Sequence, residues 1–196
     1  LFNKNIIQKY ILLLTSYAFY AYWDYRFLSL IIFSSVLDFF IGKKIFNTRD
    51  ESQAKFFLYL SLQLNLGLLG FFKYFNFFIE SANYAFSGLG LNLSSLNIIL
   101  PVGISFYTFQ SMSYSIDIYR KKINPEKSMI NFLIFVSFFP QLVAGPIVRA
   151  ADFLPQINKK IKINKKNIFT GVQIFVQGLI KKVLFADNLA VFVDDV

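Results

Sequence analysis

Long apolar runs separated by short polar or charged segments dominate the sequence. A helix needs about 20 predominantly apolar residues to cross a bilayer, and several runs come close to that length. The first four candidate spans are Ile6 to Trp23, Phe27 to Ile41, Phe56 to Ile79 and Ile98 to Tyr119. The segment from Asp24 to Arg26 is then a minimal turn between the first two spans. The pattern predicts an all-α, polytopic transmembrane helical protein.

Lysine and arginine are distributed unevenly over the connecting segments. Residues 43–55 and 120–128 are basic, whereas residues 80–97 contain neither lysine nor arginine. Cytoplasmic loops of membrane proteins carry an excess of these two residues. We therefore predict that both basic segments and the first nine residues lie in the cytoplasm. Residues 80–97 and the turn at Asp24 then lie outside.

The next apolar run, from Met129 to Val148, departs from this pattern. Its stretch "SFFPQLVAGPIVR" contains Pro140, Gly145 and Pro146, and proline interrupts a helix because it lacks the backbone donor. If the run crossed the membrane, residues 149–167, with six basic residues and one acid, would lie outside, against the lysine and arginine bias. One interpretation is a broken re-entrant segment that returns to the cytoplasm and lines an internal cavity. The other is a kinked ordinary span that is an exception to the charge rule.

Two further segments follow on the predicted cytoplasmic side. Residues Asp152 to Ile168 mix lysines with apolar side chains, which fits either a helix lying along the headgroups or a solvated loop. The apolar run from Ile168 to Ile180 has 13 residues before Lys181 and Lys182, too few to span a bilayer. Its apolar residues recur at helical spacing, so we predict a half-buried or surface-lying helix.

Composition narrows the chemistry. Of 196 residues, 56% are hydrophobic, above the roughly 45–50% typical of soluble domains. The net charge of +9 fits cytoplasmic loops and contact with anionic lipid better than nucleic acid. The chain has no cysteine and no histidine, which excludes disulfides and thiolate metal sites and removes the commonest general base and metal ligand. We predict no metal site.

Gln110 and Asp117 are the most informative polar residues inside the apolar runs. They lie two helical turns apart and therefore share a face. An acidic residue in a span is a functional-site hypothesis; the alternative is a local ion pair with Arg120 or a headgroup contact. Lys73 is expected to meet a partner or a water-filled space, and Asp38 is assigned a structural role.

No motif of a soluble enzyme is present. The sequence has neither a GxxxxGK phosphate-binding loop nor a GxSxG elbow. The residues alone leave two classes open, a transporter and a membrane enzyme.

Three long stretches add a resemblance. "LPVGISFYTFQSMSYSIDIYR", "FFPQLVAGPIVRAADFLPQI" and "GLIKKVLFADNLAVFVD" resemble the membrane-bound O-acyltransferase (MBOAT) family, most closely its bacterial alginate O-acetyltransferase branch. The earlier stretch "SYAFYAYWDYRFLSLIIFSSVLDFFIGKKI" is similar to the same branch. The resemblance therefore covers nearly the whole chain.

This resemblance implies a multi-pass enzyme of the bacterial cytoplasmic membrane. Such an enzyme passes an acetyl group from a cytoplasmic acyl thioester, such as acetyl-CoA, toward an extracellular polysaccharide, an alginate-like polymer or peptidoglycan. It also implies three partners, namely membrane lipid, the polysaccharide acceptor and a separate extracytoplasmic acetyltransferase, with no bound cofactor and no nucleic acid. A small membrane transporter or flippase subunit remains the alternative.

The resemblance also implies that the catalytic base lies elsewhere. The family's catalytic histidine falls in a later segment, so we expect it beyond Val196 and expect this chain to be inactive alone. Residues 1–196 are then a single, incomplete transmembrane domain, the amino-terminal part of a larger one. The candidates for lining a tunnel or orienting substrate are Gln110, Asp117, Pro140, Gln141, Gly145, Pro146 and Arg149.

Overall fold

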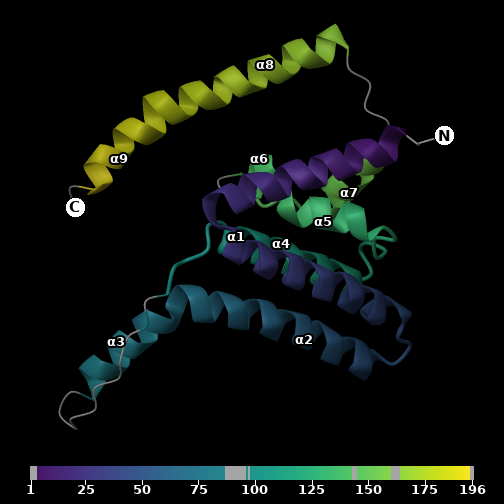
Figure 1. Cartoon of the computed structure of the whole chain (residues 1–196), viewed down its shortest axis with the longest axis vertical. Coiled ribbons are helices and arrows are strands. Elements are labelled where there is room, and N and C mark those ends of the chain that lie inside the picture. Colours follow the sequence, from purple (N-terminus) through teal and green to yellow (C-terminus); the bar gives the residue numbers. More distant parts are fainter. Residues whose placement is uncertain (1–3, 87–95, 97, 143–144, 160–163, 195–196) are drawn as a thin grey trace. The chain divides into compact units, whose positions relative to one another are not determined.

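The computed structural model describes residues 4–86, 96, 98–142, 145–159 and 164–194 (Figure 1). These residues form helices and their connections, with no strand among them. The chain divides into two compact units, Leu1–Lys159 and Lys160–Val196. Three helices are long and apolar enough to cross a membrane, at Ile6–Asn47, Glu51–Ala85 and Lys165–Ala190. The prediction of an all-α membrane protein is confirmed.

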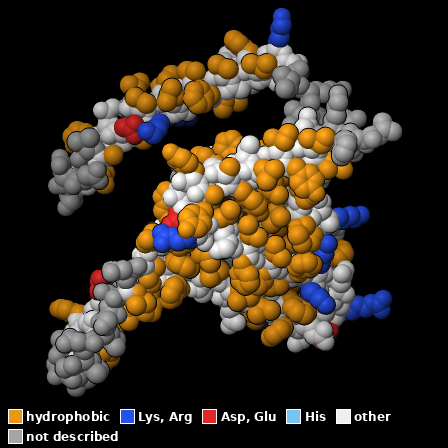
Figure 2. All heavy atoms as spheres, in the orientation of Figure 1, with side chains coloured by type: hydrophobic (Ala, Val, Ile, Leu, Met, Phe, Trp, Pro, Cys, Tyr) orange, Lys and Arg blue, Asp and Glu red, His pale blue; other side chains and the backbone are white. Residues whose placement is uncertain are grey.

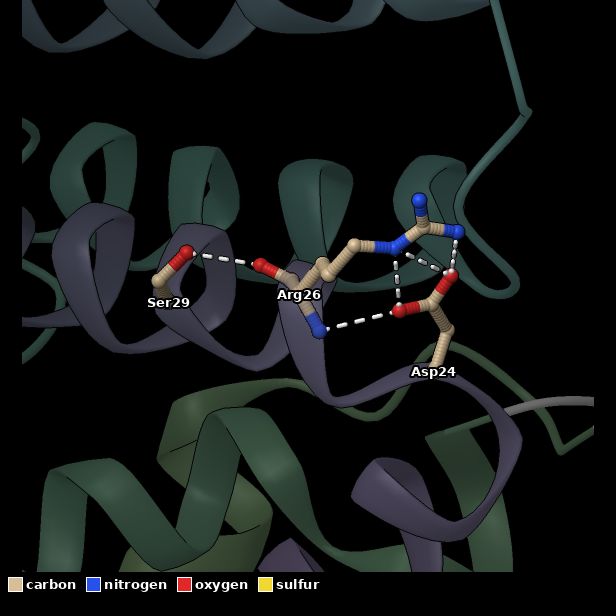
Figure 3. Close-up of polar contacts among 3 residues, drawn as sticks. All are labelled: Asp24, Arg26 and Ser29. Atoms are coloured by element: carbon tan, nitrogen blue, oxygen red, sulfur yellow. Dashed lines mark hydrogen bonds and ion pairs between the residues drawn. The ribbon is translucent and has the colours of Figure 1, made fainter.

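Helix α1 (Lys4–Asn47) is two helical arms joined at Asp24. Asp24 has an extended backbone, with φ −159° and ψ 108°, and the chain reverses direction there (Figure 1). The Asp24 carboxylate accepts the backbone N–H of Arg26 at 2.9 Å, as an N-cap does, and pairs with the Arg26 guanidinium at 2.6 Å (Figure 3). The predicted turn between the first two spans is confirmed.

The third predicted span is one long helical stretch. It consists of α2 (Glu51–Leu69), a π-helical turn η1 (Gly70–Tyr74) and α3 (Phe75–Ala85). Asp50 caps it by accepting the backbone N–H of Ser52 at 3.0 Å. The helix begins at Glu51 rather than Phe56, so Lys73 lies about 33 Å along it. The hydrocarbon core of a bilayer is about 30 Å thick, which puts Lys73 close to the far side.

That Lys73 meets a partner or a water-filled space stays a prediction. Its side chain is exposed, and its Nζ lies 5.3 Å from the ring centroid of Tyr74. Most of the loop predicted at residues 80–97 falls outside the described residues, although α3 shows that its first six residues are helical.

Helix α4 (Ile104–Tyr119) forms the centre of the first unit. It begins at Ile104, within the predicted span from Ile98, and follows Gly103, whose φ of +73° glycine adopts readily. Its 16 residues give a length of about 24 Å, less than the hydrocarbon core of a typical bilayer. α4 by itself is thus too short to cross that core.

The run predicted to be broken is broken. It forms α5 (Met129–Ser137), the short α6 (Phe139–Leu142) and, after a non-helical connection, α7 (Ala150–Asn158). In Figure 1, α7 returns toward the end of the unit from which α5 starts. α7 buries Ala150 and Leu154 and exposes most of its other side chains, so the part of the predicted segment up to Asn158 is helical.

Aromatic side chains form much of the core between α1, α4 and α5. Phe132 is fully buried and lies between Tyr114 and Phe39, with ring centroids at 4.4 and 6.0 Å. Gly42 lets α1 approach α4 closely, because a Cβ there would lie 2.8 Å from Cε1 of Tyr114 and 2.9 Å from Cδ1 of Ile118. Packing at this contact fixes where α4 lies against α1.

The second unit corrects the prediction of a short helix ending at Ile180. Helix α8 (Lys165–Ile180) continues through a π-helical turn η3 (Lys181–Ala186) into α9 (Asp187–Asp194). Lys182 does not end the helix; its Nζ pairs with the Asp187 carboxylate at 3.1 Å. Residues Lys165–Ala190 are therefore long and apolar enough to cross a membrane, and the prediction that this run is too short to span one is wrong.

Hydrophobic and charged side chains are separated on the visible face of the first unit. Hydrophobic side chains cover most of that face, and most of the visible lysine and arginine side chains lie at the end where α1 meets α2 and α4 meets α5, with a smaller blue and red group at the opposite end (Figure 2). A broad apolar surface with charge concentrated at one end is typical of a protein immersed in a bilayer.

Two glycines test the close packing of α1 on α4. We expect Gly42→Ala to lower the free energy of unfolding by about 1–3 kcal/mol, because the added methyl overpacks the contact with Tyr114. Gly67→Ala is the matched control, because nothing lies within 4 Å of a Cβ there, and it should stabilise the helix by about 0.5–1 kcal/mol. Detergent-denaturation titrations followed by circular dichroism measure both. Equal effects of the two substitutions would contradict the packing account.

Candidate functional site

The candidate site is built around the break between α5 and α6. Phe138, with φ −59° and ψ 106°, leaves the helical region and ends α5 after Ser137. A helix that ends inside a membrane leaves carbonyl groups without intrahelical donors, and these must find other partners. The site is therefore defined by the side chains that supply those partners.

Gln110 and Gln141 both turn their amides to the same carbonyl. Nε2 of Gln110 donates to the Phe135 carbonyl at 2.8 Å, and Nε2 of Gln141 lies 3.4 Å from the same oxygen. Gln110 comes from α4 and Gln141 from α6, and both are buried. Two predicted candidates thus meet at the last turn of α5, where the break leaves the backbone in need of donors.

Other side chains complete the pairing around the break. The Ser16 hydroxyl on α1 accepts the Phe139 N–H at 3.4 Å, and the Ser137 hydroxyl donates to the Leu133 carbonyl at 2.7 Å. Tyr20 on α1 donates its hydroxyl to the carbonyl of Val102, just before α4, at 3.0 Å. Hydroxyl and amide side chains from α1, α4 and α6 therefore replace the hydrogen bonds of an unbroken helix.

Two glycines permit the tight return of the chain. A Cβ on Gly103 would lie 2.5 Å from the Leu142 carbonyl oxygen, and a Cβ on Gly145 would lie 2.4 Å from Cα of Gln141. No side chain fits at either distance. The close approach to Gln141 is a physical reason for a glycine at position 145. Val143 and Ala144, also in the predicted turn, lie outside the described residues.

The two ends of the broken segment come together. Nδ2 of Asn131, at the start of α5, donates to Oδ1 of Asn158, at the end of α7, at 2.9 Å. Nζ of Lys9 on α1 donates to the same oxygen at 3.0 Å. The chain from residue 131 to 158 thus begins and ends at one place, beside the amino-terminal part of α1. This is the geometry expected of a re-entrant segment and not of a kinked span.

The remaining candidates do not take part in the glutamine pairing. Asp117 is buried two helical turns further along α4. Among the described residues, its carboxylate forms no ion pair with Arg120. Pro140, Pro146 and Arg149 are exposed. Arg149 is the N-cap of α7, and its carbonyl accepts the first backbone donors of that helix.

Sequence reasoning missed a second polar cluster around Asp38. The fully buried Asp38 carboxylate accepts the Ser61 hydroxyl at 2.6 Å and the Asn65 amide at 2.7 Å. Ser61 Oγ also lies 3.1 Å from Ser115 Oγ. The cluster ties α1, α2 and α4 together, which agrees with the structural role assigned to Asp38. The four-residue spacing of Ser61 and Asn65 was the available signal, because residues at that spacing share one helix face.

The arrangement holds the backbone at the break in place but offers no strong base. The glutamine amides and serine hydroxyls donate and accept hydrogen bonds without taking up a proton at neutral pH. Proton transfer at neutral pH calls for a group such as histidine, and the chain has none. The site thus fits a structural and positioning role within a membrane protein.

Comparison with known proteins supplies relatives of this chain. No protein-family model and no solved structure matches it. It is 41% identical over 192 residues to the probable alginate O-acetylase AlgI of Pseudomonas syringae pv. tomato, covering 95% of this chain and 37% of that protein. It is 36% identical over 220 residues to the peptidoglycan O-acetyltransferase of Helicobacter pylori, covering 98% and 41%.

A third relative has the same description as the first. The probable alginate O-acetylase AlgI of Pseudomonas aeruginosa is 40% identical over 189 residues, covering 95% of this chain and 36% of that protein. The resemblance recognised in the sequence is therefore confirmed. The chain spans about two fifths of the length of the curated relatives it matches.

The pairing at the helix break can be tested with two glutamines. Gln110→Leu removes the shorter of the two bonds to the buried Phe135 carbonyl, so we expect the free energy of unfolding to fall by about 1–3 kcal/mol. Gln156→Leu is the matched control, because Gln156 also donates to a backbone carbonyl but does so on an exposed surface. Its effect should stay within about 0.5 kcal/mol. If a detergent-denaturation titration gives the same loss for both, Gln110 does not stabilise the break.

Proposed function

We propose that this chain is part of a membrane O-acetyltransferase that passes an acetyl group from a cytoplasmic acyl thioester toward an extracellular polysaccharide. The observation that carries the proposal is the similarity over 95% or more of the chain to proteins named for O-acetylation of alginate and of peptidoglycan. The donor fits acetyl-CoA or another cytoplasmic thioester. The acceptor is an alginate-like polymer or peptidoglycan.

The same similarity and the helices support the proposed location. Three helices of the described part are long and apolar enough to cross a membrane, and the relatives are bacterial proteins. The proposal puts the protein in the bacterial cytoplasmic membrane as a multi-pass protein, in contact with lipid. The polysaccharide acceptor and a separate extracytoplasmic acetyltransferase are its proposed partners.

The geometry of the broken segment supports a route between the two membrane faces. α4 is about 24 Å long. The tip of the broken segment, marked by Leu142 and Gly145, reaches the start of α4, where the Leu142 carbonyl lies against Gly103. A short helix beside a segment that doubles back reduces the thickness of protein that a donor and an acceptor must bridge. In this role Gln110 and Gln141 keep the tip in place.

The chemical step itself needs a base. In acyl transfer the acceptor hydroxyl oxygen attacks the thioester carbonyl, the carbon–sulfur bond breaks, and a base takes the hydroxyl proton. This chain contributes positioning, because the side chains at the break donate and accept hydrogen bonds without taking up that proton. The 196-residue chain expressed alone is accordingly predicted to transfer no acetyl group.

Substitution of Gly145 tests the role of the tip in the protein at its natural length. A side chain at Gly145 collides with Gln141, so we expect Gly145→Leu to displace the tip and lower the rate of acetyl transfer by about 100-fold. Transfer of radiolabelled acetyl groups from the thioester into polysaccharide, in vesicles carrying the protein and its partner, measures this rate. Insertion into the membrane should be unchanged.

Gly67→Ala is the control, because it adds a methyl group in open space and should leave the rate unchanged. Full activity of Gly145→Leu would show that the tip does not line the route. Transport of a polymer precursor by the wild-type protein, with no acetyl transfer, would replace the enzyme with a transporter or flippase.

A further inference from the structure

A hollow of about 740 Å³ lies at the basic end of the first unit. It is lined by the start of α1, the connection from α4 to α5, the first turn of α5 and the exposed end of α7. Its polar lining includes Lys9, Lys122, Glu126, Lys127, Asn131 and Asn158. The break between α5 and α6 lies at the other end of α5, so this hollow is separate from the candidate site above.

Asn131 carries the strongest indication of a ligand. Its side chain is only 2% exposed, and its amide group donates to Glu126 Oε1 at 3.1 Å and to Asn158 Oδ1 at 2.9 Å. Its own Oδ1 is buried and has no hydrogen-bond partner among the described residues. Buried acceptors are nearly always satisfied, so a ligand that donates a hydrogen bond would complete this group.

The charge of the hollow favours an anion. Three lysines line it against one carboxylate, and that carboxylate, Glu126, already accepts from Ser128 N at 3.0 Å and from Asn131. The first turn of α5 adds the positive end of a helix dipole. Lys9 Nζ gives one donor to Asn158, which leaves it further donors for a ligand.

We propose that this hollow binds the headgroup of an anionic glycerophospholipid of the phosphatidylglycerol type. The phosphate lies among Lys9, Lys122 and Lys127, and a headgroup hydroxyl donates to Oδ1 of Asn131. Apolar lining from Leu154 and Pro155 accommodates the glycerol backbone. Basic pockets at the cytoplasmic ends of membrane helices are suited to lipid phosphates. A soluble phosphate ester with a neighbouring hydroxyl has the same chemistry and is the competing source.

Native mass spectrometry of the natural-length protein in detergent tests this site with defined lipids. We expect phosphatidylglycerol to bind more tightly than phosphatidylmethanol, which has the same charge but no hydroxyl for Asn131. The double substitution Lys122→Gln and Lys127→Gln should weaken phosphatidylglycerol binding by about tenfold. Lys44→Gln is the matched control, because Lys44 is exposed at the same end but outside the hollow; it should leave binding unchanged.

Added glycerol 3-phosphate separates the two sources. If millimolar glycerol 3-phosphate does not displace phosphatidylglycerol, the lipid is the ligand; if it binds alone to the wild type and not to the double variant, the ligand is a soluble phosphate ester. Equal binding of both lipids, or equal losses in the double variant and in Lys44→Gln, would overturn the proposal. The lysine substitutions are on exposed side chains, so the folded protein remains available for each comparison.

Discussion

The structure depends on one requirement, that backbone groups inside a membrane must be hydrogen-bonded within the protein. α5 stops at Ser137 while still among the other helices, so its last carbonyls and the first donors of α6 need outside partners. Gln110 and Gln141 supply donors to the Phe135 carbonyl, and Ser16 accepts from Phe139. The break is therefore stable only when α1, α4 and α6 all lie in their observed places.

The contacts elsewhere in the first unit hold those helices in place. Gly42 allows Tyr114 to pack directly on α1, and the Tyr114 hydroxyl accepts the Glu126 N–H at 3.0 Å, which ties α4 to the connection before α5. The Asp38 cluster joins α1 and α2 to α4 from within. These contacts fix the position of α4, and through Gln110 they fix the geometry at the break. A positioning role in acetyl transfer would rest on this chain of contacts.

Local signals in the sequence predicted the elements well and the contacts poorly. The turn at Asp24 follows from the apolar runs on either side of it, and the break near Pro140 follows from a residue whose backbone preference is strong. The shared carbonyl of Gln110 and Gln141 could not be predicted, because the two residues lie far apart in the sequence and no local pattern reports their pairing.

The failures also have physical reasons. Lys182 was taken as the end of a helix, but its charge is paired with Asp187 on the next turn, so the helix continues. The third span was set to start at Phe56 and not at the Asp50 cap, so Lys73 lies further along its helix than the prediction placed it. In both cases the position of one charge depended on a partner or a cap several residues away, which hydropathy along the chain does not show.

The central claim is that the segment from α5 to α7 enters and leaves on one side of the membrane. Single cysteines in a chain that has none test it directly by reaction with an impermeant thiol reagent in intact and permeabilised cells. Tyr25→Cys, at the exposed turn of α1, should react in intact cells, and Asn124→Cys, in the connection before α5, should react only after permeabilisation. Gln156→Cys, on the exposed surface of α7, should behave like Asn124→Cys. Reaction of Gln156→Cys in intact cells would show that the segment crosses the membrane and would contradict the account.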